Sequence, residues 1–145
     1  MENANAQAVS ATFEPDIVVL YCQQSAIEPA ELAGASRKME GFTVRFVNLP
    51  CSSNVEIGSL VKIFEQGVDG IQVVGCPIGT CRFLGGNTRA ERRVRHVKDI
   101  LGRMDFGAER LGMVRAGQLS TEDLIEFARM RAEAVTEIGP NPMRG

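Results

Sequence analysis

Aromatic side chains are scarce in this sequence, which has no tryptophan, one tyrosine and one histidine. Proteins that bind nucleic acids usually combine stacking aromatics with a basic excess, but the formal net charge here is −2. No apolar run approaches the roughly 20 residues of a membrane-spanning helix. The opening MENANAQAVSATFEP lacks the charged and apolar regions of a secretory signal. These absences argue against nucleic-acid binding, membrane insertion and secretion, and they predict a cytoplasmic protein.

Residue patterns typical of enzymes are missing as well. The sequence has no Ser-His-Asp set, no paired catalytic carboxylates and no phosphate-binding loop motif. The turn Gly85-Gly86-Asn87 precedes a predicted helix, but it lacks the spacing of a dinucleotide fingerprint, so we interpret it as a tight turn. His96 lies on a basic helix face and is predicted to be solvated rather than a ligand. We therefore expect no substrate turnover within this chain.

Four cysteines remain as the chemically distinctive residues. In a reducing compartment thiols seldom form structural disulfides, so metal ligation or redox chemistry is favoured. Cys76 and Cys81 share one loop, in which Pro77 restricts the backbone and Gly79 permits a left-handed turn, so both sulfurs can face one point. Cys22 or Cys51 taken alone is more typical of a small buried apolar residue.

Apolar patterning predicts one α/β domain over residues 15–139, between a flexible arm at 1–14 and a tail at 140–145. Continuous or alternating apolar runs indicate four strands, at residues 16–22, 43–49, 71–75 and 111–115. Helical periodicity and capping signals predict four helices, at residues 28–39, from an N-cap at Ser53 or Asn54 to Gly67, at 88–103, and from the capping box at 120–123 to near Gly139.

Strands that alternate with helices predict right-handed crossovers and a three-layer parallel sheet, flavodoxin-like or Rossmann-like, with the four strands in the order 2-1-3-4. The carboxyl ends of parallel strands share one edge. Cys22 ends the first strand, Cys51 follows the second, and Cys76 and Cys81 follow the third. The crevice between strands one and three is also the usual ligand site of this architecture. We therefore expect all four thiols to meet at this edge.

Four thiolates suit either tetrahedral zinc or an iron–sulfur cluster, and spacing alone does not choose between them. Zinc is the weaker hypothesis because the domain has its own core and no paired C-x2-C knuckles. A dithiol enzyme would usually show C-x-x-C, which is absent. A flavin-binding function rests on the fold alone, and the loop after the first strand lacks a hydroxyl-rich phosphate cradle.

The segments DIVVLYC, LPC and DGIQVVGCPIGTCRFLGGNTRAERRV resemble the iron–sulfur (delta) subunit of methyl-viologen-reducing hydrogenase. The similarity covers residues 16–138, and its most specific part is the pattern GC-x4-C-x4-GN-x3-E-x-R that begins at Gly75. The resemblance implies a [2Fe–2S] cluster bound by Cys22, Cys51, Cys76 and Cys81. Many family members have a second cysteine shortly after the first strand, where this sequence has Gln23, Gln24 and Ser25.

The resemblance also implies a function and partners. Family members pass single electrons between two partners in anaerobic hetero-oligomers: a further redox protein and a flavin-containing, heterodisulfide reductase A-like subunit. These assemblies include electron-bifurcating complexes and tungsten-dependent benzoyl-coenzyme A reductase complexes. The alternative function is a zinc-bearing structural adaptor without redox activity. Backbone N–H groups around Gly75, Gly79 and Gly85 are predicted hydrogen-bond donors to the cluster.

Basic residues gather in and just before the third predicted helix, at Arg82, Arg89, Arg92, Arg93 and Arg95. Such a run is usually a solvated face. Its position beside the cysteine loop also suits the docking of an acidic partner, for which Arg82 is the leading candidate.

Overall fold

The structure is a computed structural model that describes residues 13–23, 25–27, 34–49, 55–75 and 86–143, with only the backbone of residues 86–88. The arm predicted for residues 1–14 therefore lies outside the described residues except for its last two. Phe13 packs against the apolar core, and Glu14 lies 3.9 Å from Lys38 in an ion pair between largely exposed side chains.

Five strands form one sheet in the order β2-β3-β1-β4-β5. Four of them are the predicted strands, here β1 (Asp16–Cys22), β3 (Phe42–Leu49), β4 (Gly70–Gly75) and β5 (Leu111–Arg115). All four are parallel, and their order confirms the predicted arrangement. Because β1 and β4 lie at the centre, helices cover both of their faces, which explains why both strands are almost wholly apolar.

The fifth strand, β2 (Ser36–Met39), corrects the helix predicted for residues 28–39. It pairs antiparallel with β3, and Met39 lies opposite Phe42, so Glu40 and Gly41 form a two-residue hairpin turn. Gly41 has a φ of 92°, which suits such a turn. Residues 28–33 lie outside the described part of the chain.

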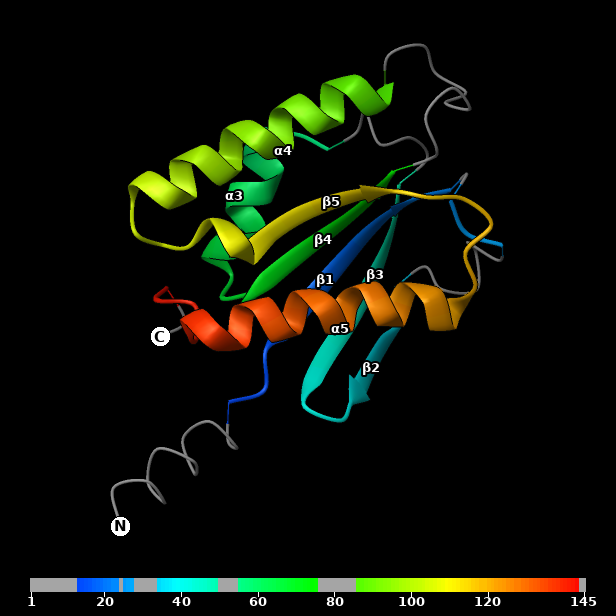
Figure 1. Ribbon diagram of the computed structural model, residues 1–145, viewed down its shortest axis with the longest axis horizontal. Helices are drawn as coiled ribbons and strands as arrows, with labels where there is room; N and C mark the ends of the chain where they lie inside the picture. Colours follow the sequence, from blue (N-terminus) through cyan, green and yellow to red (C-terminus); the bar gives the residue numbers. More distant parts are fainter. Residues whose placement is uncertain (1–12, 24, 28–33, 50–54, 76–85, 144–145) are drawn as a thin grey trace.

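Helices cover both faces of the sheet, which confirms the three layers (Figure 1). The helices α3 (Ile57–Glu65) and α4 (Gly86–Arg103) lie on one face and α5 (Thr121–Ile138) on the other. The helix α3 begins later than predicted, with Glu56 as its N-cap, and the proposed caps Ser53 and Asn54 lie outside the described residues. The capping box that opens α5 is present, formed by Ser120 and Asp123.

Each layer of helices encloses its own apolar cluster. The α3 and α4 side contains Val94, Val97 and Leu101 from α4, and Leu60 and Phe64 from α3. Two further apolar residues of α3 lie outside this cluster, because Ile57 is 37% exposed and Val61 is 36% exposed. On α5 the buried residues are Leu124, Ile125, Ala128, Ala132 and Val135, whereas the apolar side chain of Met130 is 57% exposed.

Polar side chains at the amino-terminal edge of the sheet connect the chain ends to the core. The carboxylate of Asp69 accepts hydrogen bonds from the backbone N–H groups of Asp16 and Asn141, each 2.8 Å long. The Asn141 side chain donates to the carbonyls of Phe64 and Val68. Residue 141, which we assigned to a tail, is thus 2% exposed.

Arg110 is buried in the short helix η2 (Ala108–Arg110) that leads into β5. Its guanidinium donates to four backbone carbonyls, those of Phe106, Asp69, Gly139 and Pro140. No helix among the described residues is long and apolar enough to cross a membrane.

Candidate metal centre

Cys22 is the last residue of β1 and is 1% exposed, with a free thiol. It is the one predicted ligand within the described residues. Cys51, Cys76 and Cys81 lie outside them, as do Gly79, Gly85 and Arg82, and their predicted roles stay predictions. The structure does describe the residues from which the segments that contain these cysteines depart.

The carboxyl ends of β1, β3 and β4, which lead into these segments, lie side by side at the carboxyl edge of the sheet. Cys22 pairs with Leu49 of β3, two residues before Cys51. On its other side, the register of β1 with β4 ends at Tyr21 beside Val74, so the next pair is Cys22 with the residue before Cys76. Adjacent strands are about 4.8 Å apart. The structure thus brings together the ends of three strands that precede cysteine positions.

The row continues across the sheet to β5, where Arg115 pairs with Gly75. Side chains alternate between faces along a strand, and Val18 and Leu20 pack into the cluster beneath α3 and α4. Cys22 therefore belongs to that face. The same face holds Leu111 and Met113 of β5, and with them Arg115.

Three buried polar atoms lack a hydrogen-bond partner within the described part of the chain: Ser25 Oγ, Asn48 Oδ1 and Arg115 Nε. All three belong to residues at the carboxyl edge, at or just beyond the ends of β1, β3 and β5. A buried donor or acceptor without a partner costs about 1–3 kcal/mol. Such atoms call for a partner from the adjoining segments or from a bound group. The Ser25 hydroxyl and the Arg115 N–H are donors, and they suit a site rich in sulfur acceptors.

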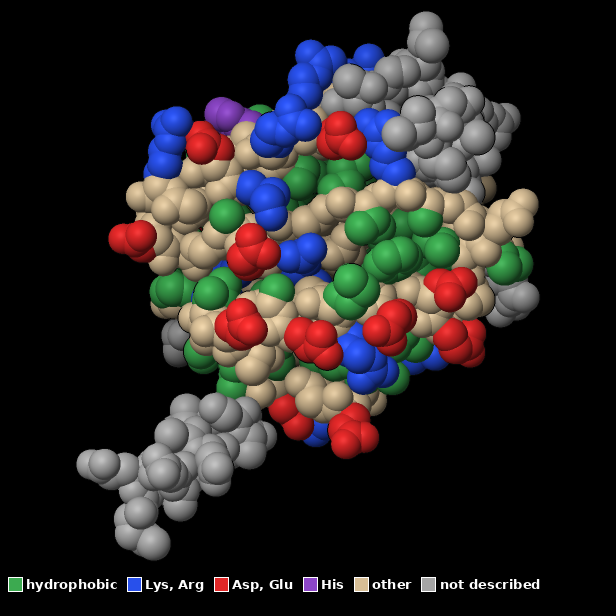
Figure 2. Space-filling view, viewed as in Figure 1, with side chains coloured by type: hydrophobic (Ala, Val, Ile, Leu, Met, Phe, Trp, Pro, Cys, Tyr) green, Lys and Arg blue, Asp and Glu red, His purple; other side chains and the backbone are tan. Residues whose placement is uncertain are grey.

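Charge is distributed unevenly around this edge. The helix α4 carries six basic and two acidic side chains, whereas α5 carries five acidic and two basic ones. Figure 2 shows the Lys and Arg side chains gathered over α4 and the Asp and Glu side chains over α5. Figure 1 shows that α4 begins on the same side of the molecule as the carboxyl ends of the strands. The basic side chains in the first turns of α4 are thus the ones nearest the candidate site.

The basic residues of α4 have different roles. As predicted, Arg89, Arg92, Arg95 and the neighbouring His96 are exposed. Arg93 differs because it is half-buried and donates a 2.8 Å hydrogen bond to the carbonyl of Val55. Arg115 of β5 forms a 3.1 Å ion pair with Glu91 of α4, whose other carboxylate oxygen lies 3.9 Å from Arg95.

Burial shifts the pKa of three groups. It raises the pKa of Tyr21, whose side chain lies in the α5-side cluster next to Cys22 in the chain. It lowers the pKa of Lys98, which donates to the carbonyls of Ala108 and Leu111, although nearby Glu109 opposes this shift. Burial likewise lowers the pKa of Arg131, which remains a cation that donates to Gln72.

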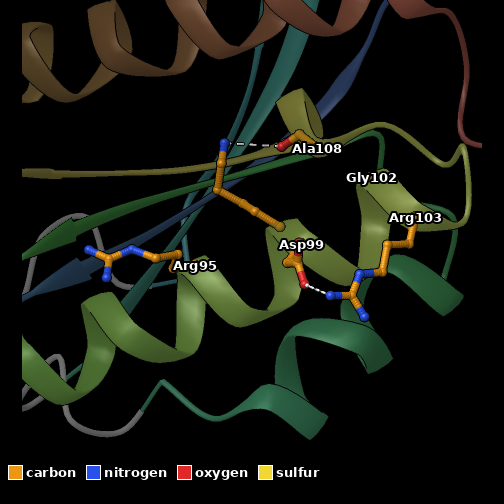
Figure 3. A pocket seen from close by; sticks show the side chains of 6 residues that line it. Arg95, Asp99, Gly102, Arg103 and Ala108 are labelled. Carbon is orange, nitrogen blue, oxygen red and sulfur yellow. Dashed lines mark hydrogen bonds and ion pairs between the residues drawn. The ribbon is translucent and has the colours of Figure 1, made fainter.

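A pocket of about 460 Å³ lies at the other end of α4, away from the cysteine segments. Its lining includes Lys98, Gly102 and Ala108, and Figure 3 shows Asp99 turned toward Arg103, with which it forms a 3.0 Å ion pair. The pocket contains no thiol and lies beside the amino-terminal end of β5. It is therefore separate from the candidate metal centre.

The described residues alone do not form a complete metal site. Among them, no group of three or more His, Cys, Asp or Glu side chains is placed to hold a metal ion. Sequence reasoning placed Cys22 at the end of β1, where the structure has it, but it missed Ser25, Asn48 and Arg115. Their sequence signal was only their position at or after strand ends.

Comparison with known proteins shows which family this chain resembles. The family model described as methyl-viologen-reducing hydrogenase, delta subunit, matches residues 17–139. The iron–sulfur D subunit of the F420-non-reducing hydrogenase vhu from Methanocaldococcus jannaschii is 33% identical over 131 residues, which are 90% of this chain and 98% of that protein. The iron–sulfur D subunit of the F420-non-reducing hydrogenase from Archaeoglobus profundus is 32% identical over 91% of this chain and 96% of its own length.

A third relative is much longer than this chain. It is the A subunit of the ferredoxin/F420H2-dependent CoB-CoM heterodisulfide reductase of Methanosarcina acetivorans, which is 25% identical over 87% of this chain but only 16% of its own length. The same type of domain therefore also occurs as one part of a larger protein. From the family match and the two hydrogenase relatives together, this chain belongs to the methyl-viologen-reducing hydrogenase delta subunit family.

Proposed function

We propose that this chain is an electron-transfer subunit in which Cys22, Cys51, Cys76 and Cys81 bind a [2Fe–2S] cluster. In this role it relays single electrons between two redox partners in a cytoplasmic, anaerobic hetero-oligomer, of which electron-bifurcating complexes are one type. The names of the hydrogenase relatives, which call them iron–sulfur subunits, support an iron–sulfur cofactor.

The observation that carries the proposal is the row of strand ends at the carboxyl edge. Cys22 is the middle member of this row, between the strand that leads toward Cys51 and the strand that leads into Cys76. Short connections therefore suffice to bring the other thiols to it. The position also agrees with the general location of ligand sites in parallel sheets.

When bound, the cluster would supply one-electron redox chemistry. The chain's own contribution is to hold and shield it. Cys22 is buried on the face of the sheet that α3 and α4 cover, which limits the access of water to this proposed ligand. The Ser25 hydroxyl is fully buried, and it is a candidate donor to a sulfur atom.

The proposed partners are a further redox protein and a flavin-containing, heterodisulfide reductase A-like subunit. The match to one part of a heterodisulfide reductase supports the second, because domains fused in one protein often associate as separate chains in another. The exposed basic residues of α4, which adjoin the candidate site, suit an acidic surface on a partner.

Metal analysis tests the cofactor. Protein purified without oxygen should contain two irons and two acid-labile sulfides per chain, and both should be lost in Cys22→Ala and Cys76→Ala. Leu20→Ala is the matched control, because Leu20 is similarly buried on the same face of β1 but has no thiol. It should keep the cluster under conditions in which it stays folded.

Two results would contradict the proposal. One zinc per chain with no sulfide would identify the structural adaptor instead, and loss of iron from Leu20→Ala at full folded content would attribute the Cys22 effect to packing.

Anaerobic size-exclusion chromatography with a purified heterodisulfide reductase A-like subunit tests the partner. Co-elution that weakens with salt is expected, and separate elution at low salt would rule that partner out.

A further inference from the structure

Arg115 combines three features at the candidate metal centre. It ends β5 in the same cross-strand row as Cys22, with only Gly75 between them. That glycine has no side chain to fill the space between the two. The Arg115 side chain is 17% exposed, and its buried Nε–H has no hydrogen-bond acceptor in the described part of the chain.

The charge of this guanidinium is only partly offset. Its Nη2 atom lies 3.1 Å from Glu91 Oε2, so one carboxylate faces it. That carboxylate also faces Arg95 at 3.9 Å and is 43% exposed, so water screens it more than it screens the arginine. Within the described residues, a mostly buried positive charge with one N–H donor that lacks an acceptor therefore remains at the edge from which the cysteine loop departs.

We propose that Arg115 raises the reduction potential of the centre held by the cysteines and that Glu91 opposes this effect. The inference rests on the proposed function. Reduction adds one electron, supplied by a redox partner protein, and so adds negative charge at the cysteine edge. A nearby guanidinium stabilises the reduced form more than the oxidised form, and its Nε–H can donate to a sulfur.

Because Arg115 and Glu91 carry opposite charges, replacing each with a neutral residue should shift the reduction potential in opposite directions. The potential is measured by anaerobic redox titration of the full chain, followed by electron paramagnetic resonance. Arg115→Gln should lower it and Glu91→Gln should raise it. For Arg115→Gln we expect the ratio of reduced to oxidised centre at a fixed potential to fall about tenfold, which is about 59 mV for one electron.

Two further variants separate charge, hydrogen bonding and general disturbance. Arg115→Lys keeps the charge but lacks the Nε–H, so it should recover only part of the loss. Arg45→Gln is the matched control, because Arg45 forms a similar 3.2 Å ion pair with Asp16 near the opposite edge of the same sheet. It should leave the potential unchanged.

The outcomes are decisive in each case. Unchanged potentials in both Arg115→Gln and Glu91→Gln, or shifts of the same sign, would overturn the inference while leaving the proposed function intact. A shift in Arg45→Gln as large as that in Arg115→Gln would also overturn it. If Arg115→Gln does not fold, the sign of the Glu91→Gln shift decides, and absence of iron and sulfide from the wild-type chain refutes the proposed function itself.

Discussion

Replacing Arg110 with methionine tests whether a buried guanidinium holds the amino-terminal edge of the sheet together. Methionine retains most of the apolar stem but removes the donors to four carbonyls, at distances of 2.8–3.1 Å. It also removes the contact between the guanidinium and the Phe106 ring, whose centroid is 5.2 Å away. The change therefore removes hydrogen bonds while approximately preserving volume.

The magnitude depends on which carbonyls water can reach after the change. Pro140 is exposed and Gly139 is half-buried, so their carbonyls can be hydrated. Those of Asp69 and Phe106 belong to buried residues, and the loss of a buried hydrogen bond at each costs about 1–3 kcal/mol. The lost cation–π contact adds about 1 kcal/mol. Relief of the cost of burying a charge offsets part of this sum, so we expect a loss of about 2–4 kcal/mol.

Equilibrium unfolding in urea, followed by far-ultraviolet circular dichroism, measures this loss as a shift in midpoint with an unchanged slope. Arg103→Met is the control, because its ion pair with Asp99 joins two mostly exposed side chains and should contribute about 0–1 kcal/mol. A loss below about 1 kcal/mol for Arg110→Met would refute the view that these hydrogen bonds stabilise the fold.

Three other predictions concern stability. Ser120→Ala removes the side-chain oxygen that accepts from Asp123 N at 3.2 Å and should cost about 1 kcal/mol in urea unfolding, and an unchanged midpoint would contradict the capping role. Asn141→Ala leaves the carbonyls of Phe64 and Val68 without this donor and should lower the melting temperature by about 4–10 °C, whereas a drop below about 1 °C would show that water replaces it. The lowered pKa of Lys98 means that the folded state binds its proton less tightly, so stability should rise as pH approaches the ordinary value of 10.5 from below; Lys98→Met should lack this rise, and parallel pH curves would contradict the shift.

The strands and helices that the sequence predicted well are those with strong local signals. Continuous apolar runs identified β1 and β4 because strands covered on both faces have no polar side. The capping box of α5 was visible because its two partners are three residues apart. The alternation of strands and helices then determined the order of the parallel strands.

The features that the sequence did not predict depend on contacts between residues that are distant in the chain. The segment 36–39 has one apolar residue, and its strand conformation comes from pairing with β3 rather than from its own composition. Nothing in the local sequence distinguishes Arg110 or Asn141 from exposed residues, because their acceptors come from several elements. The same holds for Arg115 in the candidate site, whose place in the row depends on the register of β4 with β5.

The pairing pattern of the sheet has a consequence for how the protein is made. Cys22 and Gly75 are neighbours across strands but 53 positions apart in the chain. On the proposed function, a nascent chain therefore cannot assemble its cysteine ligands until β4 has been synthesised and has paired with β1. Insertion of the proposed cluster would then follow the pairing of these strands, unlike metal binding by a small zinc module that folds around its ion. The proposed ligand set would thus form only as part of the tertiary structure and not within one contiguous segment of the chain.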